Sequence, residues 1–467
     1  MDGSTVFSLA PEARIIHADD SHFIIDPIAG SWVKLPRYAG ILCEKACGQD
    51  ADLMVDRVDI IYGGRAAGEF RGLLEELSER GLMVCTKGRE EHSAQMTSGH
   101  TSPCGPKVYL SVTDECNLRC ITCYRTDGAT SGRTPTRVVT STIRRVSELD
   151  PAELIITGGE PTTRDDLPEL LMEARESCPR VILATNGTLI SDSLAAAIAQ
   201  TGVAVQISLE SADERAHDLI RGRGSYARTI AGLERLSGMG VERIELVSTI
   251  ADPSLFEPEP MMDLAGRYGA SFHASLFMEV GRGACARFAT TADPGAFARS
   301  MVRYLLQKAK GGMIAADATF DEVIGVTPRF GCGAGSFVLG VSENGGVYPC
   351  HLAMNPEFRV ELDELLEALA ASRDAGGRWF PGTLANLWSW KEPNVDSIDV
   401  CFDCDVRYFC GGGCRAAAYA ATGDIGGRDP MCRAYMLFLS CLLWNWDDAV
   451  SVEDNLSVAW AEISGLQ

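Results

Sequence analysis

Three cysteines close together constrain this chain more than any other feature of its sequence. The stretch SVTDECNLRCITCYR, residues 111–125, carries Cys116, Cys120 and Cys123 directly after the apolar β-type run VYLSV. Thiols in a chain without an export signal serve metals or catalysis rather than disulfides. The spacing alone leaves two interpretations open, a zinc site and a [4Fe–4S] cluster. It favours the cluster, because zinc often includes His among its ligands and no His lies near this loop.

Composition limits the classes of partner. At 467 residues the chain is long enough for two to four domains. Its net charge of −22 disfavours bulk binding to nucleic-acid backbones or anionic membrane surfaces. The start MDGSTVFSLAPEAR lacks the features of a signal peptide, and the longest apolar run, residues 437–444, is too short to span a bilayer. That run predicts a buried C-terminal helix, and the 17 cysteines predict a cytoplasmic protein.

Strands and helices alternate in the middle of the chain. Candidate helices such as LPELLMEARES separate six apolar β-type runs, KVYLSV, ELIITG, RVILATN, VAVQISL, RIELVSTI and SFHASLF. Six such repeats predict a parallel sheet covered by helices, either a barrel or a doubly wound sheet. Ligands of both architectures gather at the carboxyl ends of the strands. The three cysteines follow the first strand and therefore belong to that functional edge.

The flanking segments differ in character. Residues 1–86 combine short β-rich runs with two helical patterns and predict a small α+β domain, and residues 87–106 have the composition of a linker. After the 107–290 repeat region, residues 291–329 predict a helical connector and residues 436–467 a C-terminal helical segment. Residues 330–435 are rich in Gly and Cys with weak periodicity, so we expect metal ligation to stabilise them.

The ordered motifs of the repeat region resemble those of the radical S-adenosylmethionine (SAM) enzymes. CxxxCxxCY follows the first predicted strand and TGGEPT (157–162) the second, while TNGT (185–188) and SLES (208–211) follow the third and fourth. The run HDLIRGRGS (217–225) is similar to a further stretch of that family. The resemblance implies an α/β fold with a partial (β/α)6 barrel, and cleavage of SAM to a 5′-deoxyadenosyl radical.

The resemblance also implies the cofactor-binding residues. Cys116, Cys120 and Cys123 would bind three irons of a [4Fe–4S] cluster, and the amino and carboxylate groups of SAM would chelate the fourth. Glu160 would accept hydrogen bonds from the SAM amino group, although it could instead cap a helix; His217 could touch the pocket or be structural. The residues expected to contact SAM are Gly158, Gly159, Glu160, Pro161, Asn186, Ser208, Glu210 and Arg221.

A second group of cysteines lies near the C-terminus. The stretch FDCDVRYFCGGGC resembles the SPASM domain, a seven-cysteine module with auxiliary [4Fe–4S] clusters in peptide-modifying radical SAM enzymes. Zinc ribbons also use CxxC pairs, but two pairs at ribbon spacing do not occur here. By position, the resemblance assigns Cys332, Cys350 and Cys414 to auxiliary cluster I and Cys401, Cys404, Cys410 and Cys432 to auxiliary cluster II. The expected cofactors are therefore three [4Fe–4S] clusters and SAM.

Auxiliary cluster I has only three assigned ligands. Some family members place an additional Cys shortly after the first SPASM cysteine, and the stretch GCGAGSFVLGVSENGG offers none. The nearer cluster then has an open iron or takes a ligand from Cys285, Cys441 or His351. Among the remaining thiols, Cys43 and Cys47 stand at i, i+4 and predict a buried helix face.

The N-terminal segment resembles the RiPP recognition element, a small winged-helix-like domain that binds the leader of a ribosomally made precursor peptide. The matching stretches are HFIIDPIAGSWVKLPRYAGIL and FRGLLEELSERGLM. The implied fold is a three-stranded sheet with three helices, in which a peptide adds to an edge strand, here Ser31, Trp32, Val33, Lys34 and Leu35. A DNA-binding winged helix is the alternative, which the many acidic residues of the segment disfavour.

These parts predict a radical SAM peptide maturase that cross-links a precursor peptide oxidatively, through a thioether or a carbon–carbon bond. A one-electron reductant such as flavodoxin or ferredoxin is the second expected partner, with no nucleic acid and no membrane. No side chain is assigned a catalytic role beyond the clusters, because the cofactors carry the reaction. The alternatives are a peptide decarboxylase or epimerase, a sulfatase-maturase-like enzyme, a porphyrin or other small-molecule radical SAM enzyme, and a metal-binding peptide scaffold without turnover.

Overall fold

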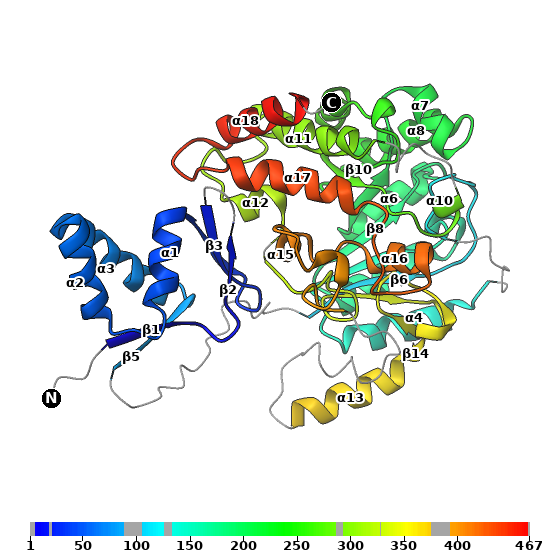
Figure 1. Ribbon diagram of the computed structural model, residues 1–467. Helices are drawn as coiled ribbons and strands as arrows, with labels where there is room; N and C mark the ends of the chain where they lie inside the picture. Colours follow the sequence, from blue (N-terminus) through cyan, green and yellow to red (C-terminus); the bar gives the residue numbers. More distant parts are fainter. Residues whose placement is uncertain are drawn as a thin grey trace. The chain divides into compact units, whose positions relative to one another are not determined.

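The chain folds into two compact units, each built from segments far apart in the sequence. The computed structural model describes residues 5–17, 21–87, 105–125, 133–285, 293–326, 328–374 and 393–465 (Figure 1). The first unit comprises Met1–Pro103, Ile324–Gly331 and Asn394–Gly412, and the second comprises Cys104–Val323, Cys332–Pro393 and Gly413–Gln467. The segment 330–435, predicted as one domain, therefore contributes to both units, and most of the predicted linker lies outside the described residues.

The first unit contains the three strands and three helices expected for its N-terminal part. β2 (Arg14–His17), β3 (Ser21–Asp26) and β4 (Ser31–Pro36) form an antiparallel sheet in that order, so β4 is an edge strand. The helices are α1 (Arg37–Ala46), α2 (Ala51–Tyr62) and α3 (Gly64–Glu79). An additional two-stranded ribbon pairs β1 (Thr5–Leu9) with β5 (Met83–Lys87).

Strand alternation gives the three-stranded sheet two different faces. Ile24 of β3 lies opposite Val33 of β4, and these residues pack with Leu35 against the helices. Cys43 of α1 is buried in the same core, as predicted, but Cys47 follows the end of the helix and is only half-buried. Because successive side chains of a strand point to opposite faces, Phe23 and Ile25 point away from these helices, and both are fully buried.

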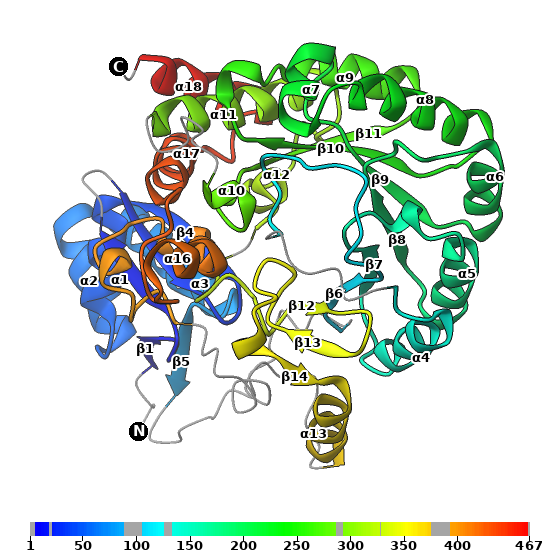
Figure 2. The same ribbon diagram turned by 90° about the vertical axis from the view of Figure 1, so that its right-hand side faces the viewer.

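The six predicted strands of the second unit form a continuous parallel array. They run in sequence order from the centre of a nine-stranded sheet to one edge, with order β11-β10-β9-β8-β7-β6-β12-β13-β14. Figure 2 shows the array curving, with helices on its outer side, so the predicted partial barrel is confirmed. The strands are β6 (Lys107–Ser111), β7 (Glu153–Thr157), β8 (Val181–Thr185), β9 (Ala204–Ser208), β10 (Ile244–Ile250) and β11 (Ser271–Leu276).

Amphipathic helices cover the outside of this array. In α6, for example, the Ser191 hydroxyl accepts the Leu194 N–H as an N-cap, while Ala195 and Ile198 are buried. The covering helices are α4 (Thr136–Ser147), α5 (Leu167–Ser177), α6 (Asp192–Thr201), α7 (Glu214–Arg221), α8 (Ser225–Gly238) and α9 (Pro258–Arg267).

A strand from the cysteine-rich region extends the barrel sheet. β12 (Val338–Val341) pairs in parallel with β6, so that Val341 lies opposite Leu110. β13 (Gly346–Tyr348) and β14 (Val360–Glu361) then continue the sheet antiparallel. The loops of this hairpin thus lie beside the strand that leads into the three-cysteine stretch.

The remaining helices follow the barrel in sequence. They are α10 (Arg282–Cys285), α11 (Pro294–Lys310), α12 (Phe320–Ile324), α13 (Leu362–Asp374), α15 (Arg407–Cys410), α16 (Arg415–Thr422), α17 (Cys432–Asn445) and α18 (Val452–Gly465). α17 packs against α11 and α18 and buries Phe438, Leu439, Leu442 and Leu443, so the predicted C-terminal buried helix is confirmed. Among the described residues, no helix has the length and apolar character needed to span a membrane.

Candidate active site

The cysteine loop, residues 112–125 after β6, is held by backbone hydrogen bonds from three directions. The N–H of Gly159, after β7, donates to the Thr113 carbonyl at 2.7 Å. The Ile121 N–H donates to the carbonyl of Ile220 in α7 at 3.0 Å. The Gly283 N–H donates to the Cys123 carbonyl at 3.1 Å. The loop is therefore a fixed part of the barrel edge, although most of it lacks regular secondary structure.

The three thiols of this loop lie within electrostatic reach of one another. Burial raises the pKa of the Cys116 and Cys120 thiols, and the neighbouring thiols of the loop raise it further. The Arg221 guanidinium opposes this effect at Cys120. Burial would lower the pKa of Arg221 itself, but Glu210 and the two nearby thiols outweigh burial and raise it. Three thiols beside one buried cation fit an iron–sulfur cluster, whose thiolate ligands carry negative charge.

Two glycines bring the end of β7 against the cysteine loop. A Cβ on Gly159 would stand 2.1 Å from the Glu115 carbonyl oxygen, and one on Gly158 would stand 2.4 Å from that of Thr113. Gly158 also has φ of 149°, which disfavours other residues. The structure explains why glycine is needed at both positions. Each glycine lies so close to the backbone of the cysteine loop that a side chain would not fit. Contact with SAM stays a prediction.

Glu160 is tied into the protein through both carboxylate oxygens. Oε1 accepts from the Thr162 hydroxyl and the Thr185 hydroxyl, each at 2.6 Å, and Oε2 accepts from the Asn186 N–H at 2.7 Å. The side chain caps the short 3-10 helix Pro161–Thr163, which was the alternative role considered from the sequence. Glu160 is 1% exposed and joins the ends of β7 and β8. Its predicted contact with the SAM amino group remains a prediction.

Asn186 connects the end of β8 to the cysteine loop. Its amide donates to the side-chain oxygen of Asn117 at 2.9 Å, and its own oxygen accepts the Thr188 N–H at 2.9 Å. Asn117 in turn donates to the Thr188 hydroxyl at 2.8 Å. Asn186 was predicted from the sequence as a site residue. Asn117 and Thr188, which complete this hydrogen-bond network, were not predicted.

The predicted residues after β9 form a buried ion pair. Glu210 accepts from Arg221 at 2.6 and 2.8 Å, and its second oxygen accepts the Thr249 N–H at 2.8 Å. The Arg221 side chain is only 15% exposed and lies within electrostatic reach of Cys120 and Cys123. His217 is fully buried, and its Nδ1 accepts the Glu210 N–H, so the histidine supports this pair. Ser208 ends β9 and is half-buried.

A second buried ion pair fastens the base of the cysteine loop. The Arg164 guanidinium donates to the carbonyls of Val112 and Thr134, each at 3.1 Å, and to the Asp166 carboxylate at 2.6 and 2.8 Å. Burial would raise the pKa of Asp166, but Arg164 and the Thr136 hydroxyl outweigh burial and hold it at about 2.

This pair predicts acid sensitivity. A folded-state pKa below the unfolded value stabilises the protein above about pH 4, and the stabilisation disappears as the pH falls toward about 2. The lowered pKa corresponds to about 2 kcal/mol. We expect the free energy of unfolding, followed by urea titration from about pH 5 to pH 3, to fall less steeply in Asp166→Asn than in the natural protein. Equal slopes would contradict the assignment.

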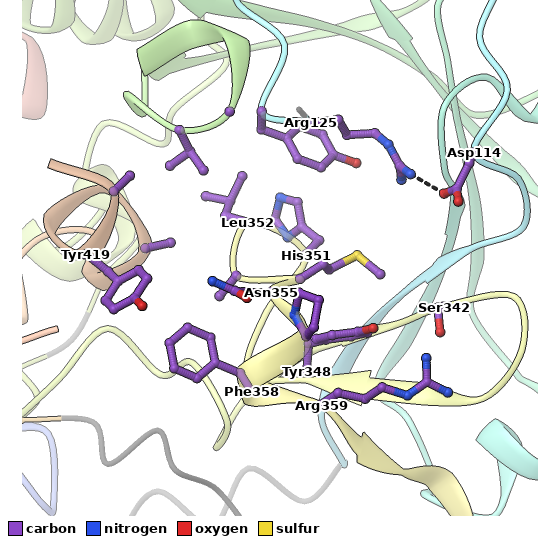
Figure 3. Close-up of a pocket in the computed structure, with 18 of the residues that line it drawn as sticks. Asp114, Arg125, Ser342, Tyr348, His351, Leu352, Asn355, Phe358, Arg359 and Tyr419 are labelled. Carbon is purple, nitrogen blue, oxygen red and sulfur yellow. Dashed lines mark hydrogen bonds and ion pairs between the residues drawn. The ribbon is translucent and has the colours of Figure 1, made fainter. Parts of the chain in front are cut away.

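A cavity of about 600 Å³ opens beside the cysteine loop within the second unit. In Figure 3, the lining residues His351, Leu352 and Asn355 lie between the Asp114–Arg125 ion pair and Tyr419. The His351 ring stacks on Tyr109 at 3.9 Å between centroids and meets Tyr124 edge-on at 5.4 Å. The remaining walls come from the β12–β13 hairpin, residues 352–359 and α16. The cavity thus lies between the cysteine loop and the cysteine-rich region.

The cysteines assigned to auxiliary cluster I belong to the second unit. Burial raises the pKa of the Cys414 thiol to about 12, and the neighbouring Asp429 and Cys350 add to the effect. The backbone N–H of Cys414 donates to Asp429 at 2.5 Å. The loop after Cys332 reaches the same region, because the Gly335 N–H donates to the Pro349 carbonyl at 2.7 Å. These contacts bring Cys350 and Cys414 together and place the Cys332 loop nearby.

The candidates for a fourth ligand of that cluster are distinguished by their contacts. The Cys441 thiol donates to the Ala459 carbonyl of α18 at 3.0 Å, so it points into the helix pair. His351 lies between two tyrosine rings in the cavity wall. The side chain of Cys285 lies outside the described residues.

The cysteines assigned to auxiliary cluster II are divided between the units. Cys401, Cys404 and Cys410 lie in the first unit, and Cys432 begins α17 in the second. The Cys404 N–H donates to the Cys401 carbonyl at 3.0 Å, and Cys410 ends α15, so one compact stretch carries three of the thiols. Their roles as ligands stay predictions.

Single metal ions and clusters require different geometry. Within the described ranges, no three His, Cys, Asp or Glu side chains converge as ligands of one ion. A zinc ion needs each sulfur ligand at about 2.3 Å. The thiols around a four-iron cluster each bind a different iron and stand further apart. None of the cysteines whose side chains are described forms a disulfide.

The predicted peptide-binding residues form the edge strand β4. Ser31 lies at its start, and its hydroxyl donates to the carbonyl of Arg80, which follows α3, at 3.1 Å. The start of the edge strand therefore lies next to the C-terminal end of α3. Peptide binding itself stays a prediction.

Comparisons with known proteins support the prediction that the barrel is a radical SAM domain. Residues 110–253 match the sequence model of the Radical SAM superfamily. The mycofactocin maturase MftC of Mycolicibacterium smegmatis is 29% identical over 339 residues, which cover 69% of this chain and 81% of that protein. An AdoMet-dependent heme synthase of Methanosarcina barkeri is 29% identical over 356 residues, covering 70% and 95%.

Among solved structures, the chain is similar to SuiB of Streptococcus suis bound to S-adenosylmethionine. The match has a TM-score of 0.53 at 13% identity and covers 91% of this chain and 99% of SuiB. SuiB bound to precursor peptide SuiA matches with a TM-score of 0.51 at 14% identity, covering 91% and 100%. At this identity the likeness concerns the fold. The ordered motifs, the barrel and the superfamily match together identify residues 110–253 as a radical SAM domain.

Proposed function

We propose that this enzyme modifies a ribosomally made precursor peptide, by oxidative cross-linking of residues in its core. The observation that carries the proposal is the cavity between the cysteine loop and the cysteine-rich region, in a chain that also presents an open-edged strand, β4. A volume of about 600 Å³ is in the range of sites for small molecules or a few side chains. The names of the maturase MftC and of the SuiB–SuiA complex support a peptide substrate.

In this proposal the chain binds, positions and shields the reactants. Cys116, Cys120 and Cys123 would hold the first [4Fe–4S] cluster, which together with bound SAM would supply the radical chemistry that removes hydrogen from the peptide. Arg221, fixed by Glu210, presents a buried cation beside that site and can bind the SAM carboxylate. The cavity walls orient the core of the peptide and exclude water.

Binding of the leader is a separate task. An extended leader would add to β4 through main-chain hydrogen bonds. One auxiliary cluster would be held by Cys332, Cys350 and Cys414, and a second by Cys401, Cys404, Cys410 and Cys432. The nearer of the two would accept the electron lost when the cross-link closes. Flavodoxin or ferredoxin would supply the electron for SAM cleavage, and the proposed location of the reaction is the cytoplasm.

Mass spectrometry of candidate precursors tests the proposal. The chain is co-expressed with each short peptide encoded beside its gene, both with and without the leader portion. A cross-link removes two hydrogen atoms, oxidative decarboxylation also removes carbon dioxide, and epimerisation leaves the mass unchanged. We expect loss of hydrogen only with the leader present. Modification without a leader would favour a sulfatase-maturase-like enzyme, and turnover of a porphyrin without any peptide would favour the heme-synthase alternative.

A further inference from the structure

The antiparallel sheet β2-β3-β4 has one face against α1–α3, and its other face contacts a segment that carries three cysteines. Ile25 pairs with Trp32 across β3 and β4, so these residues share the face that points away from α1–α3. The Trp32 ring lies 5.9 Å from the Phe23 ring and meets Phe409 edge-on at 5.3 Å. Phe409 is 1% exposed and immediately precedes Cys410. The edge strand and the cysteine segment therefore share an aromatic cluster.

The segment Asn394–Gly412 is itself well anchored within the first unit. The Val395 N–H donates to the Phe330 carbonyl at 2.9 Å, and the Arg329 N–H donates to the Tyr408 carbonyl at 2.8 Å. The Tyr408 hydroxyl donates to Asp396 at 2.8 Å. This network joins residues 328–331 to the cysteine segment and presents Phe409 to the sheet as one packed body.

We propose that the segment Asn394–Gly412 acts as the second cover of the leader-binding sheet, so that iron–sulfur occupancy at Cys401, Cys404 and Cys410 controls the order of strand β4 through the Trp32–Phe409 contact. The inference depends on the proposed function only in taking β4 as the leader-binding strand. Strand β4 is therefore fully ordered for peptide binding only when the thiols of Cys401, Cys404 and Cys410 bind their cluster.

The physical basis is linkage. The ten residues Cys401–Cys410 carry three thiols, and metal binding by these thiols would add to the order that packing already gives the segment. If metal binding orders this segment, the packing of Phe409 on Trp32 transmits part of the free energy of metal binding to β4. Because such coupling is reciprocal, a substitution of Trp32 must also weaken the binding of the metal. The coupling is therefore testable from both directions, without knowledge of the precursor.

Hydrogen exchange of the full-length, iron-loaded protein tests the first direction. Phe409→Ala is expected to increase the exchange rate of backbone amides in β3 and β4 at least about fivefold. Phe402→Ala is the matched control, because Phe402 lies in the same segment between two cysteines but is 67% exposed. Cys404→Ala should act as Phe409→Ala does, whereas Cys123→Ala, in the second unit, should leave β4 unchanged.

Iron release to a chelator tests the second direction. Trp32→Ala is expected to lose about four of its irons at least about fivefold faster than the natural protein, with the remaining iron released at the natural rate. Trp32→Phe, which keeps an aromatic ring, should restore most of the retention. Unchanged exchange in Phe409→Ala and Cys404→Ala, or unchanged iron release in Trp32→Ala, would overturn the coupling. Neither result would bear on whether a precursor peptide is modified.

Discussion

Cys123→Ala protein is expected to form no 5′-deoxyadenosine above background when incubated anaerobically with SAM and dithionite. Cys123 is one of three thiols in a loop fixed by hydrogen bonds to the end of β7, to α7 and to α10. Loss of residues that merely support a metal ligand typically costs 10–100-fold, so loss of a ligand should cost at least about 100-fold. Chromatographic quantification of 5′-deoxyadenosine measures the effect directly.

Cys178→Ala is the matched control for this experiment. Cys178 ends α5 of the same barrel, is 2% exposed and belongs to no motif. Its replacement removes one buried sulfur and should cost about 1 kcal/mol of stability with cleavage retained. Binding of the precursor leader to Cys123→Ala should also be retained, because β4 lies in the other unit. Persistent cleavage by Cys123→Ala would contradict the cluster assignment.

Gly159→Ala is expected to reduce SAM cleavage about 100-fold, because misplacement of a site by about 1 Å commonly has that effect. The new Cβ would stand 2.1 Å from the carbonyl oxygen of Glu115 and 2.7 Å from that of Asp114. Both are backbone atoms, so the cysteine loop must move as a whole. The bond from the Glu160 N–H to the Glu115 carbonyl, now 2.7 Å, would then lengthen.

Gly266→Ala makes the same chemical change where there is room for it. Gly266 lies in α9, and nothing stands within 4 Å of its added Cβ. Alanine in a helix is more favourable than glycine by up to about 1 kcal/mol, so this variant should be stable and active. Steady-state rates of 5′-deoxyadenosine formation compare the two variants. If Gly159→Ala formed 5′-deoxyadenosine as fast as the natural protein, the glycine would not be needed to position the cysteine loop.

Strong periodicity and ordered motifs made the barrel predictable. Each of the six apolar runs became a parallel strand, because buried strands carry a continuous apolar signal. β12 was not predicted, since a four-residue strand in a glycine-rich stretch has too few residues to show a period. Its place beside β6 depends on pairing with a strand more than two hundred residues away in the chain, which local pattern does not encode.

The sequence motifs predicted which segments meet at this edge of the barrel, but not the side-chain contacts between them. The motifs located Cys116, Glu160 and Arg221, and the structure brings their segments together. The inward bonding of Glu160 and the contact between Trp32 and Phe409 depend on tertiary packing. Asn117 was missed although it lies inside the quoted cysteine motif, because its only signal was its position between two ligands.

The measurement that tests the account most directly is the iron, acid-labile sulfide and zinc content of anaerobically prepared protein. Three [4Fe–4S] clusters predict about twelve irons per chain with matching sulfide. About four irons would confine the cluster chemistry to the cysteine loop and contradict the auxiliary clusters. Zinc in place of iron would contradict the account as a whole.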